Sequence, residues 1–184
     1  MNDLPISLSV KLTAQNSSPH TLIVSAFALQ EGTWDSVGQP TVGQPVQPGF
    51  TGCWLAITTV SPGAVQGSMQ FCVAQAGTLE VTWDLDPRKP FAPVCTNNLT
   101  DPTLAAGLYV NQGNFTNVWV QLILSFVTTA LKGETLQDIA DRFGTTLGAL
   151  LYVNHFTSNA RLTEGQRVLV ASQPLVGNGP LDCD

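Results

Sequence analysis

The first part of the chain alternates between apolar and polar side chains. In residues 6–13 every second side chain is aliphatic and the others are Ser, Lys or Thr, which is the pattern of a strand with one buried face. Residues 16–20, Asn-Ser-Ser-Pro-His, have turn chemistry, and residues 21–29 are apolar on both faces. We therefore predict that residues 6–13 and 21–29 form a β-hairpin.

Glycine and proline dominate residues 31–49, which contain the sequence Val-Gly-Gln-Pro twice. Because proline lacks a backbone N–H, this segment is predicted to be a surface loop or an extended edge segment. Short alternating runs then resume, and they predict strands at residues 54–59, 68–74, 78–84, 109–110 and 118–124. Short strands separated by turn signals, without a long helical pattern, are typical of an antiparallel β-sandwich.

The periodicity changes after residue 125. Residues 125–131 are β-branched and apolar, and they predict another strand. Apolar side chains then recur with the period of one helix face, at Leu136, Ile139, Ala140 and Phe143. Thr135 and Asp138 have the spacing of a capping box, and Gly144 is a typical C-terminal residue. A helix is therefore predicted over residues 135–143.

A second short helix is predicted after the pair Thr145-Thr146, which offers a hydroxyl cap. Its marks are Leu147, Leu150, Leu151 and Asn154. A turn at Gly165-Gln166 then precedes a strand at residues 167–170, which is predicted to pair with residues 125–131. The predicted order is strand, helix, helix, strand.

This last stretch resembles the lysin motif (LysM) family over residues 126–171. Residues 133–136, Gly-Glu-Thr-Leu, stand where the family has Gly-Asp-Thr-Leu, and residues 139–146, Ile-Ala-Asp-Arg-Phe-Gly-Thr-Thr, follow in register. The match continues through Ala-Leu-Leu at residues 149–151 and Asn154, and it closes with residues 161–170. The resemblance implies a small βααβ module after the sandwich, in a chain whose fold is mainly β.

The resemblance also implies a function, which is binding of β-1,4-linked N-acetylglucosamine chains, as in chitin or peptidoglycan, without cleavage. In the family the sugar lies in a shallow groove between two loops. Carried over to this sequence, the first wall of the groove is Gly133, Glu134, Thr135 and Leu136. The second wall is Asn154, His155, Phe156, Thr157 and Ser158.

The chemistry of tight loops suits this ligand, because backbone groups hydrogen-bond a neutral amide and hydroxyls without any charge. Phe156 is predicted to cover the apolar face of the sugar. Two positions depart from the family pattern. Glu134 replaces the common Asp, and His155-Phe156 replaces the Pro that often follows the Asn.

Composition excludes nucleic acid as a partner. Of 184 residues, 43% are hydrophobic and only 11% are charged, which describes a folded globular protein. The net charge is −6, and residues 1–125 carry three basic side chains against seven acidic ones. Residues 126–171 carry four of each sign. An acidic chain without a basic patch repels phosphate backbones.

No export or membrane-spanning signal is visible. The N-terminus lacks the basic start and apolar core of a secretory signal. The most apolar window, residues 118–127, is far shorter than the roughly 20 residues that span a bilayer. We expect a soluble protein that is either cytoplasmic or exported by a non-classical route, with association with the cell wall or surface as a further alternative.

The cysteines leave two alternatives open. Cys53, Cys72, Cys95 and Cys183 show no Cys-x-x-Cys spacing, so no metal site is predicted. They fit two disulfides, one of which ties the C-terminal tail back, or four reduced and mostly buried thiols.

A second resemblance concerns residues 6–124. Its motifs, in chain order, are Asn16-Ser-Ser, Gly32-x-Trp34, Val46-x-Pro48-Gly49, Gly67 and Thr82-Trp83-Asp84. This order resembles the aegerolysin group of actinoporin-like sandwiches, which implies a protein that recognises membrane lipids. Because indoles prefer the bilayer interface, the candidates for a lipid-facing patch are Trp34, Trp54, Trp83 and Trp119. The alternative is that most of these tryptophans are core residues.

Catalysis is not predicted. His20 and His155 lie in different parts of the chain, and neither is in a motif that activates a Ser or Cys nucleophile. The close carboxylate pairs, at positions 84 and 86 and at 138 and 141, fit solvation and capping better than a glycosidase pair. Phosphate-binding glycine loops are absent. We expect neither an enzyme nor a cofactor.

The sequence thus predicts a non-catalytic binding protein in three parts, which are a sandwich (residues 1–124), a LysM module (125–171) and a tail (172–184). The module would bind N-acetylglucosamine polymers while the sandwich engages a second target. Almost no linker separates the first two parts, so we expect them to pack together. The alternatives are a membrane-active, toxin-like protein whose sandwich binds lipid, and a structural component that uses LysM for protein contacts.

Overall fold

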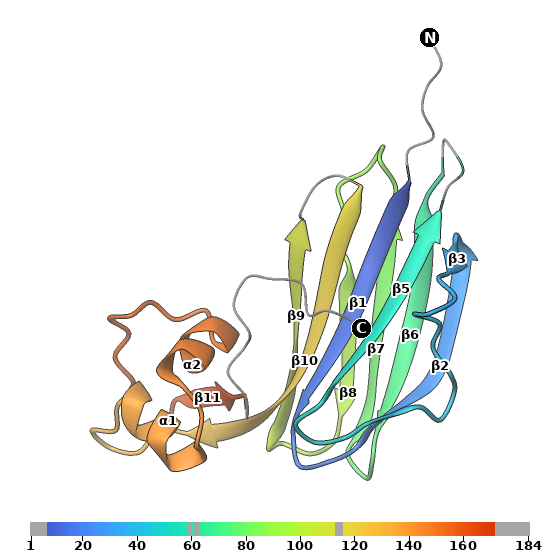
Figure 1. Ribbon diagram of the computed structural model, residues 1–184. Coiled ribbons are helices and arrows are strands. Elements are labelled where there is room, and N and C mark those ends of the chain that lie inside the picture. Colours follow the sequence, from blue (N-terminus) through green and yellow to red (C-terminus); the bar gives the residue numbers. More distant parts are fainter. Residues whose placement is uncertain (1–6, 59, 61–62, 113–115, 172–184) are drawn as a thin grey trace.

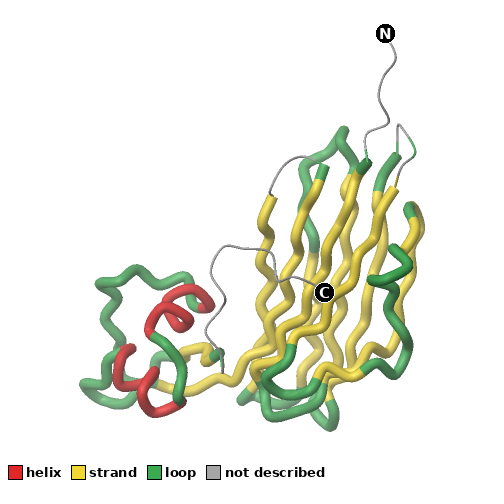
Figure 2. The backbone as a smooth tube through the Cα atoms, viewed as in Figure 1, coloured by secondary structure: helices red, strands yellow, loops and turns green. Residues whose placement is uncertain are grey.

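The computed structural model describes residues 7–58, 60, 63–112 and 116–171. Ile6, Thr59 and the predicted tail of residues 172–184, which includes Cys183, lie outside these ranges. The strands form two facing sheets, and a small helical module stands beside one end of them (Figures 1 and 2). The predicted fold, a mainly β sandwich followed by a βααβ module, is confirmed.

The first sheet has the order β11-β10-β1-β5-β3, and β9 also pairs with β10. The second sheet has the order β4-β2-β6-β7-β8. The strands of the sandwich are β1 (Leu8–Ser17), β2 (Leu22–Glu31), β3 (Thr33–Trp34), β4 (Pro45–Val46), β5 (Thr51–Thr58), β6 (Val65–Val73), β7 (Gly77–Leu85), β8 (Val94–Leu99), β9 (Leu104–Gln112) and β10 (Asn117–Thr129). The module adds α1 (Leu136–Phe143), α2 (Leu147–Val153) and β11 (Arg167–Val170).

Alternation along the strands produces the main core between the two sheets. On β7 the side chains of Leu79, Val81 and Trp83 are buried, whereas the intervening Thr and Glu side chains are partly exposed. Matching aliphatic side chains of β1, β6 and β10 fill the same core. The period-two pattern of the sequence therefore marks the inner faces correctly.

The predicted hairpin of residues 6–13 and 21–29 is wrong, because β1 and β2 belong to different sheets. β1 pairs parallel with β10 and antiparallel with β5, so one pair of the sandwich departs from the antiparallel expectation. The buried Asn16 side chain explains the crossing. Its amide donates hydrogen bonds to the carbonyl oxygens of His20 (2.7 Å) and Val46 (2.8 Å). The turn signal marks a change of direction, and Asn16 connects the turn at His20 to the distant strand β4 at Val46.

Two further differences concern the edges of the sheets. Strand β8 was not predicted, because its side chains are mostly exposed and do not alternate; its backbone pairing with β7 defines it. The segment 31–49 contributes only the two-residue strands β3 and β4, which lie at sheet edges as expected for a proline-rich segment.

Strand β10 is shared by the sandwich and the module. It pairs with β1 as far as Ser125 and with β9 as far as Phe126, and Phe126–Thr129 pair antiparallel with β11. The predicted strands at 118–124 and 125–131 are therefore one strand of 13 residues. The predicted pairing of the second of them with residues 167–170 is confirmed.

The two helices begin and end as predicted. Thr135 caps α1 in a complete capping box with Asp138, and Gly144 ends the helix with a left-handed φ of 62°. Thr146 caps α2, and Asn154 is its C-terminal cap residue. Their apolar faces and β11 enclose a second, small core. We call residues 129–171 the C-terminal module.

The module packs on the outer face of the first sheet. Leu122 and Leu124 point into the sandwich, so Ile123 between them points outward, yet it is 1% exposed. Val153 and Ala171 of the module cover it, and Tyr109 and Leu169 lie against the same cluster. The expectation that the two parts pack together is therefore confirmed.

Neither cysteine alternative describes the chain. Cys53 is disulfide-bonded, whereas Cys72 and Cys95 are free thiols. Cys72 lies opposite Thr78 on the outer face of the second sheet, and Cys95 lies opposite Val81 on its inner face. Strand β7 separates the two, and strands two positions apart are about 10 Å from each other, beyond the reach of a disulfide.

Within the described ranges, no helix is long and apolar enough to cross a membrane.

Candidate functional site

The first wall of the predicted groove contains two supporting side chains. Glu134 is only 9% exposed; its Oε2 accepts a hydrogen bond from the Leu131 N–H (2.8 Å), and its Oε1 lies 3.2 Å from Arg142 Nη2. Leu136 is buried in the core of the module. The backbone around Gly133, whose φ is 77°, is open to a ligand on this wall. Thr135 is exposed, but its hydroxyl already donates to Asp138 Oδ2 (2.7 Å) and accepts from the Asp138 N–H (3.2 Å).

Glu134, which replaces the Asp common in the LysM family, has a structural role. Arg142 Nη2 also donates to Thr128 Oγ1 (3.2 Å) on β10. Glu134 and Arg142 therefore connect the first loop to α1 and to the strand that precedes it. Because these two charges are paired, the wall presents little net charge to a ligand.

Asn154, at the start of the second wall, uses both its side-chain nitrogen and its side-chain oxygen in hydrogen bonds within the protein. Its amide nitrogen donates to the carbonyl oxygens of Leu150 (2.8 Å) and Leu169 (2.9 Å), and its Oδ1 accepts from the Leu169 N–H (2.8 Å). The side chain thus connects α2 to β11 and fixes where the second loop begins. Its role in this structure is to position the wall.

Of the other side chains in the second wall, one packs against the module core and three are exposed. Phe156 is half-buried against the module core, and its N–H donates to the Leu151 carbonyl (2.9 Å). His155, Thr157 and Ser158 are exposed. Leu136 and Phe156 belong to the same small core, so the structure places both predicted walls around one set of packed side chains.

Three aromatic side chains meet where the sandwich and the module join. The Tyr109 ring of β9 stacks on Tyr152 of α2, with centroids 5.1 Å apart and planes at 23°, and it lies 5.2 Å from the His155 ring. The Tyr109 hydroxyl donates to the Val153 carbonyl (2.7 Å). Burial, and secondly the neighbouring Tyr152, raises the pKa of Tyr109 to about 12. We call Tyr109, Tyr152 and His155 the junction cluster.

Sequence reasoning did not identify Tyr109 or Tyr152 as site residues. They lie on different elements, and the period-two pattern assigns Tyr109 only to a strand. The available signal was that these are the two tyrosines of the chain. Nothing local indicates that they stack.

The four tryptophans of the predicted lipid patch are not equivalent. Trp54 and Trp83 are 1% and 3% exposed and belong to the core, as the alternative for most of them predicted. Trp34 packs edge-on against Trp83 and Phe27 at centroid distances of 6.0 and 5.9 Å. Trp119 is partly exposed, opposite Lys11 and Asn111. Of the four, only Trp34 and Trp119 have partly exposed side chains.

A shallow groove of about 460 Å³ lies on the second sheet. It is lined by Gln30, Gln66, Gly67, Ser68, Glu80, Thr82, Trp83, Asp84 and Ala92. Gln30 sits at a β-bulge, where Leu29 and Glu31 pair with neighbouring residues of β6 and Gln30 has no opposite partner. Bulges bend a strand and redirect side chains, which accounts for Gln30 at the groove. Most of the lining is polar, and sequence reasoning did not predict it.

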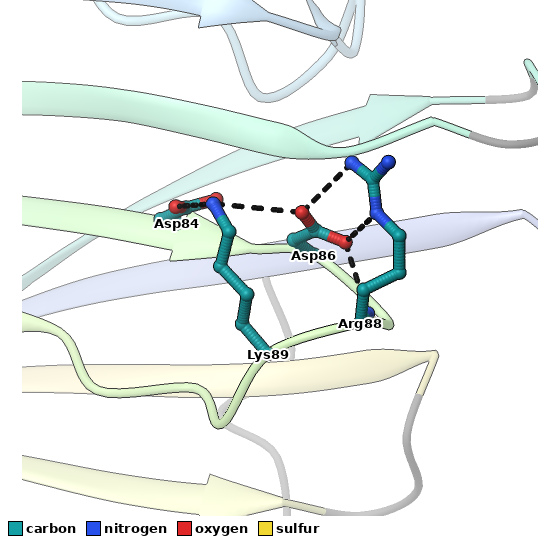
Figure 3. Close-up of polar contacts among 4 residues, drawn as sticks. All are labelled: Asp84, Asp86, Arg88 and Lys89. Carbon is teal, nitrogen blue, oxygen red and sulfur yellow. Dashed lines mark hydrogen bonds and ion pairs between the residues drawn. The ribbon is translucent and has the colours of Figure 1, made fainter.

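An ion-pair network holds the loop that follows β7, as Figure 3 shows. Asp86 is 3% exposed, and its oxygens accept from Arg88 Nε (2.8 Å), Arg88 Nη2 (2.9 Å) and the Arg88 backbone N–H (2.9 Å). Lys89 Nζ lies 2.9 Å from Asp84 Oδ2 and 3.5 Å from Asp86 Oδ2. The Arg88 side-chain hydrogen bonds hold the pKa of Asp86 far below its usual range.

This network corrects the sequence-based interpretation of Asp84 and Asp86 as simply solvated carboxylates at a strand end. Asp86 is buried, and it is paired with Arg88 and Lys89 of the loop that follows β7. Elsewhere, His20 lies 3.7 Å from Asp101, in the sandwich. Across the part of the chain that the structure describes, no cluster of three or more His, Cys, Asp or Glu side chains is placed to hold a metal ion.

Three solved structures are similar to this chain. The crystal structure of the lipid binding protein Nakanori superimposes with a TM-score of 0.51 at 11% identity, over 64% of this chain and 70% of that chain. The RahU protein in complex with a TRIS molecule gives a TM-score of 0.49 at 17% identity, over 70% of this chain and 100% of that chain. IP-1A from Alcaligenes faecalis gives 0.45 at 10% identity, over 63% and 90%.

At 11% identity the likeness to Nakanori concerns the fold alone, and it is consistent with the aegerolysin-like order of motifs in residues 6–124. No curated protein matches the chain. The family comparison bears on the other part of the molecule. Residues 129–171 match the model described as the LysM domain, which confirms the resemblance that the sequence motifs indicated.

Proposed function

We propose that the chain binds N-acetylglucosamine-containing glycans through the groove of its LysM module and does not cleave them. The observation that carries the proposal is the LysM match over residues 129–171. The arrangement of the two loops supports it, because Leu136 and Phe156 anchor them to one core and Asn154 fixes the start of the second loop.

The exposed groups suit a neutral ligand. The open parts of the two walls are the backbone at Gly133 and the hydroxyl-bearing side chains of Thr157 and Ser158. N-acetylglucosamine offers an amide and several hydroxyls, which such groups bind by hydrogen bonds. In this proposal Glu134 and Asn154 position the walls, since their polar atoms already bond to the protein.

Calorimetric titration of the full chain with chitin oligomers and with soluble peptidoglycan fragments tests the proposal. We expect saturable binding of at least one of them, and Thr157→Arg should weaken it by placing a bulky charge on the second wall. Gly148→Arg is the matched control, because Gly148 lies at the opposite end of α2 with open space around its Cβ position. Folded protein that binds neither glycan would contradict the proposal.

A second candidate function belongs to the sandwich, which we propose binds the headgroup of a membrane lipid in the groove on the second sheet. The groove offers Glu80, whose carboxylate has no hydrogen-bond or ion-pair partner among the described residues, and Asp84 beside the Lys89 ammonium. Charges of both signs at one polar groove suit a zwitterionic headgroup. The likeness of the fold to that of the lipid binding protein Nakanori supports this candidate.

Liposome pelleting tests this second function. Vesicles of phosphatidylcholine, phosphatidylethanolamine or phosphatidylserine would be compared, and Glu80→Lys is expected to abolish any binding to the two zwitterionic lipids. Glu164→Lys, at an exposed position of the module, makes the same charge change away from the groove. Pelleting that is absent from all vesicles, or that is equal for both variants, would count against the groove.

A further inference from the structure

The junction cluster lies beside the second wall of the proposed glycan groove. His155 belongs to both, since it follows Asn154 in the wall and its ring lies 5.2 Å from the Tyr109 ring. Tyr152 stacks on the same Tyr109 ring. One side chain of the sandwich therefore contacts two side chains of the module at the edge of the groove.

Tyr109 is held firmly in this place. Its hydroxyl hydrogen bond to the Val153 carbonyl is 2.7 Å long, and its ring packs against Ile123, Val153 and Ala171, which are buried. The position of Tyr109 is therefore set by contacts to both the sandwich and the module. A ring fixed in this way is a preorganised support for the two rings that lie on it.

His155 adopts a backbone conformation that the contact with Tyr109 helps to explain. Its φ is 53°, and Gln75 is the other non-glycine residue with a positive φ in the part of the chain that is described. Such conformations are unfavourable for side chains with a Cβ and persist where neighbouring contacts over-determine them. The His155 N–H bond to the Tyr152 carbonyl (3.2 Å) and the ring contact with Tyr109 supply such contacts.

Part of the cluster stays open to solvent. Tyr152 is 43% exposed, and His155 is exposed as well. Together they present aromatic surface at the point where the second wall meets the sandwich. The C–H face of a pyranose ring packs on aromatic rings of this kind, while its hydroxyls stay hydrated.

We propose that the junction cluster is an additional sugar subsite, in which Tyr152 and His155 receive the apolar face of an N-acetylglucosamine unit that extends beyond the groove towards the sandwich. Tyr109 is the positioning residue that supports both rings. This inference rests on the proposed glycan-binding function and adds that the sandwich helps to build the site. Longer oligomers should therefore bind more tightly than short ones.

Calorimetry with chitotriose and chitohexaose tests the subsite on the full chain. We expect wild-type protein to bind chitohexaose about tenfold more tightly than chitotriose, the change in Kd that corresponds to a contact of about 1.4 kcal/mol. Tyr152→Ala should remove this difference and leave chitotriose binding unchanged, because Tyr152 lies outside both walls of the groove. Val110→Ala is the control. Val110 is an exposed apolar residue next to Tyr109 on β9, and its side chain points to the face of the strand opposite to Tyr109.

The outcomes separate the inference from the function on which it rests. If wild-type protein binds neither oligomer, the proposed function fails and the subsite with it. If it binds both and the Tyr152→Ala variant keeps the full advantage of chitohexaose, the subsite alone is wrong.

A second measurement requires no variant. The chain has two histidines, so the imidazole C–H signals in a proton NMR spectrum are those of His155 and His20. Chitohexaose is expected to shift the His155 signals more than chitotriose does. The His20 signals, from a side chain beside Asp101 in the sandwich, serve as the internal reference. Equal shifts of His155 with both oligomers would overturn the subsite.

Discussion

The hydroxyl of Tyr109, on a strand of the sandwich, donates a 2.7 Å hydrogen bond to the backbone carbonyl of Val153 in the LysM module. Arg167 of the module makes a second polar contact across the junction, from its Nη2 to the Pro102 carbonyl (3.3 Å). Because β10 also runs through both parts, backbone pairing, apolar packing and hydrogen bonds all fix the position of the module. Any ligand of the module is therefore presented at a defined place relative to the sandwich.

Replacement of Tyr109 by Phe should destabilise the junction modestly. The variant keeps the ring that stacks on Tyr152 but leaves the Val153 carbonyl without its donor, and the loss of one such bond costs about 0.5–1.5 kcal/mol. Urea denaturation followed by tryptophan fluorescence measures the difference in the free energy of unfolding. Tyr152→Phe is the control, since no hydrogen bond of the Tyr152 hydroxyl occurs among the described residues. Equal effects of the two variants would contradict the role given to the Tyr109 bond.

The junction should loosen at high pH. In the folded protein burial raises the pKa of Tyr109 from 10.0 to about 12, so folding favours its neutral form. The corresponding stabilisation is complete below pH 10 and is lost as the pH rises towards 12. In a Tyr152→Phe variant Tyr109 is the single tyrosine. Burial, the larger cause of the shift, remains in this variant, so its phenolate absorbance should appear with a midpoint above 10 while the protein is folded, and a midpoint at 10 would disprove the prediction.

Asp86→Asn should loosen the loop after β7 and change the acid response of the protein. The Asp86 pKa lies below its ordinary value of 3.8 because Arg88 bonds to the charged carboxylate. Wild-type stability from this group is present above pH 3.8 and is lost as the pH falls below it. The thermal unfolding midpoint of D86N should therefore be lower at neutral pH and depend less on acid. An unchanged midpoint at neutral pH would show that the pair contributes nothing.

Asn154→Ala should destabilise the module strongly for a single polar side chain. The change removes three hydrogen bonds and leaves the N–H of Leu169 without its acceptor, at a cost of about 1–3 kcal/mol. Hydrogen exchange of the amides of α2 and β11 measures the effect locally. The exposed Ser158→Ala is the control in the same loop. If N154A weakens glycan binding without any change in exchange, Asn154 contacts the ligand instead of positioning the wall.

Much of the module could be predicted because the residues that begin and end its helices are close together in the sequence. The capping box of Thr135 and Asp138 and the left-handed Gly144 involve neighbours in sequence, and the structure shows both as expected. The predicted strand at residues 167–170 also has the predicted bounds. The site residues were less predictable. The sequence does not indicate that the polar atoms of Glu134 and Asn154 bond to other groups of the protein. Their partners, Arg142 and the Leu169 N–H, come close to them only in the folded module.

By itself, the sequence determined most of the strands and both helices, although not β8, and it determined which faces of β7 and α1 are buried. The reason is that the period of the apolar side chains is set by backbone geometry. Only the tertiary structure decided the partners of those segments. It placed β1 beside β10 instead of β2, and it brought Tyr109 to Tyr152 and His155. Such pairings join residues far apart in the chain, and they depend on how complete faces pack, which no local pattern records.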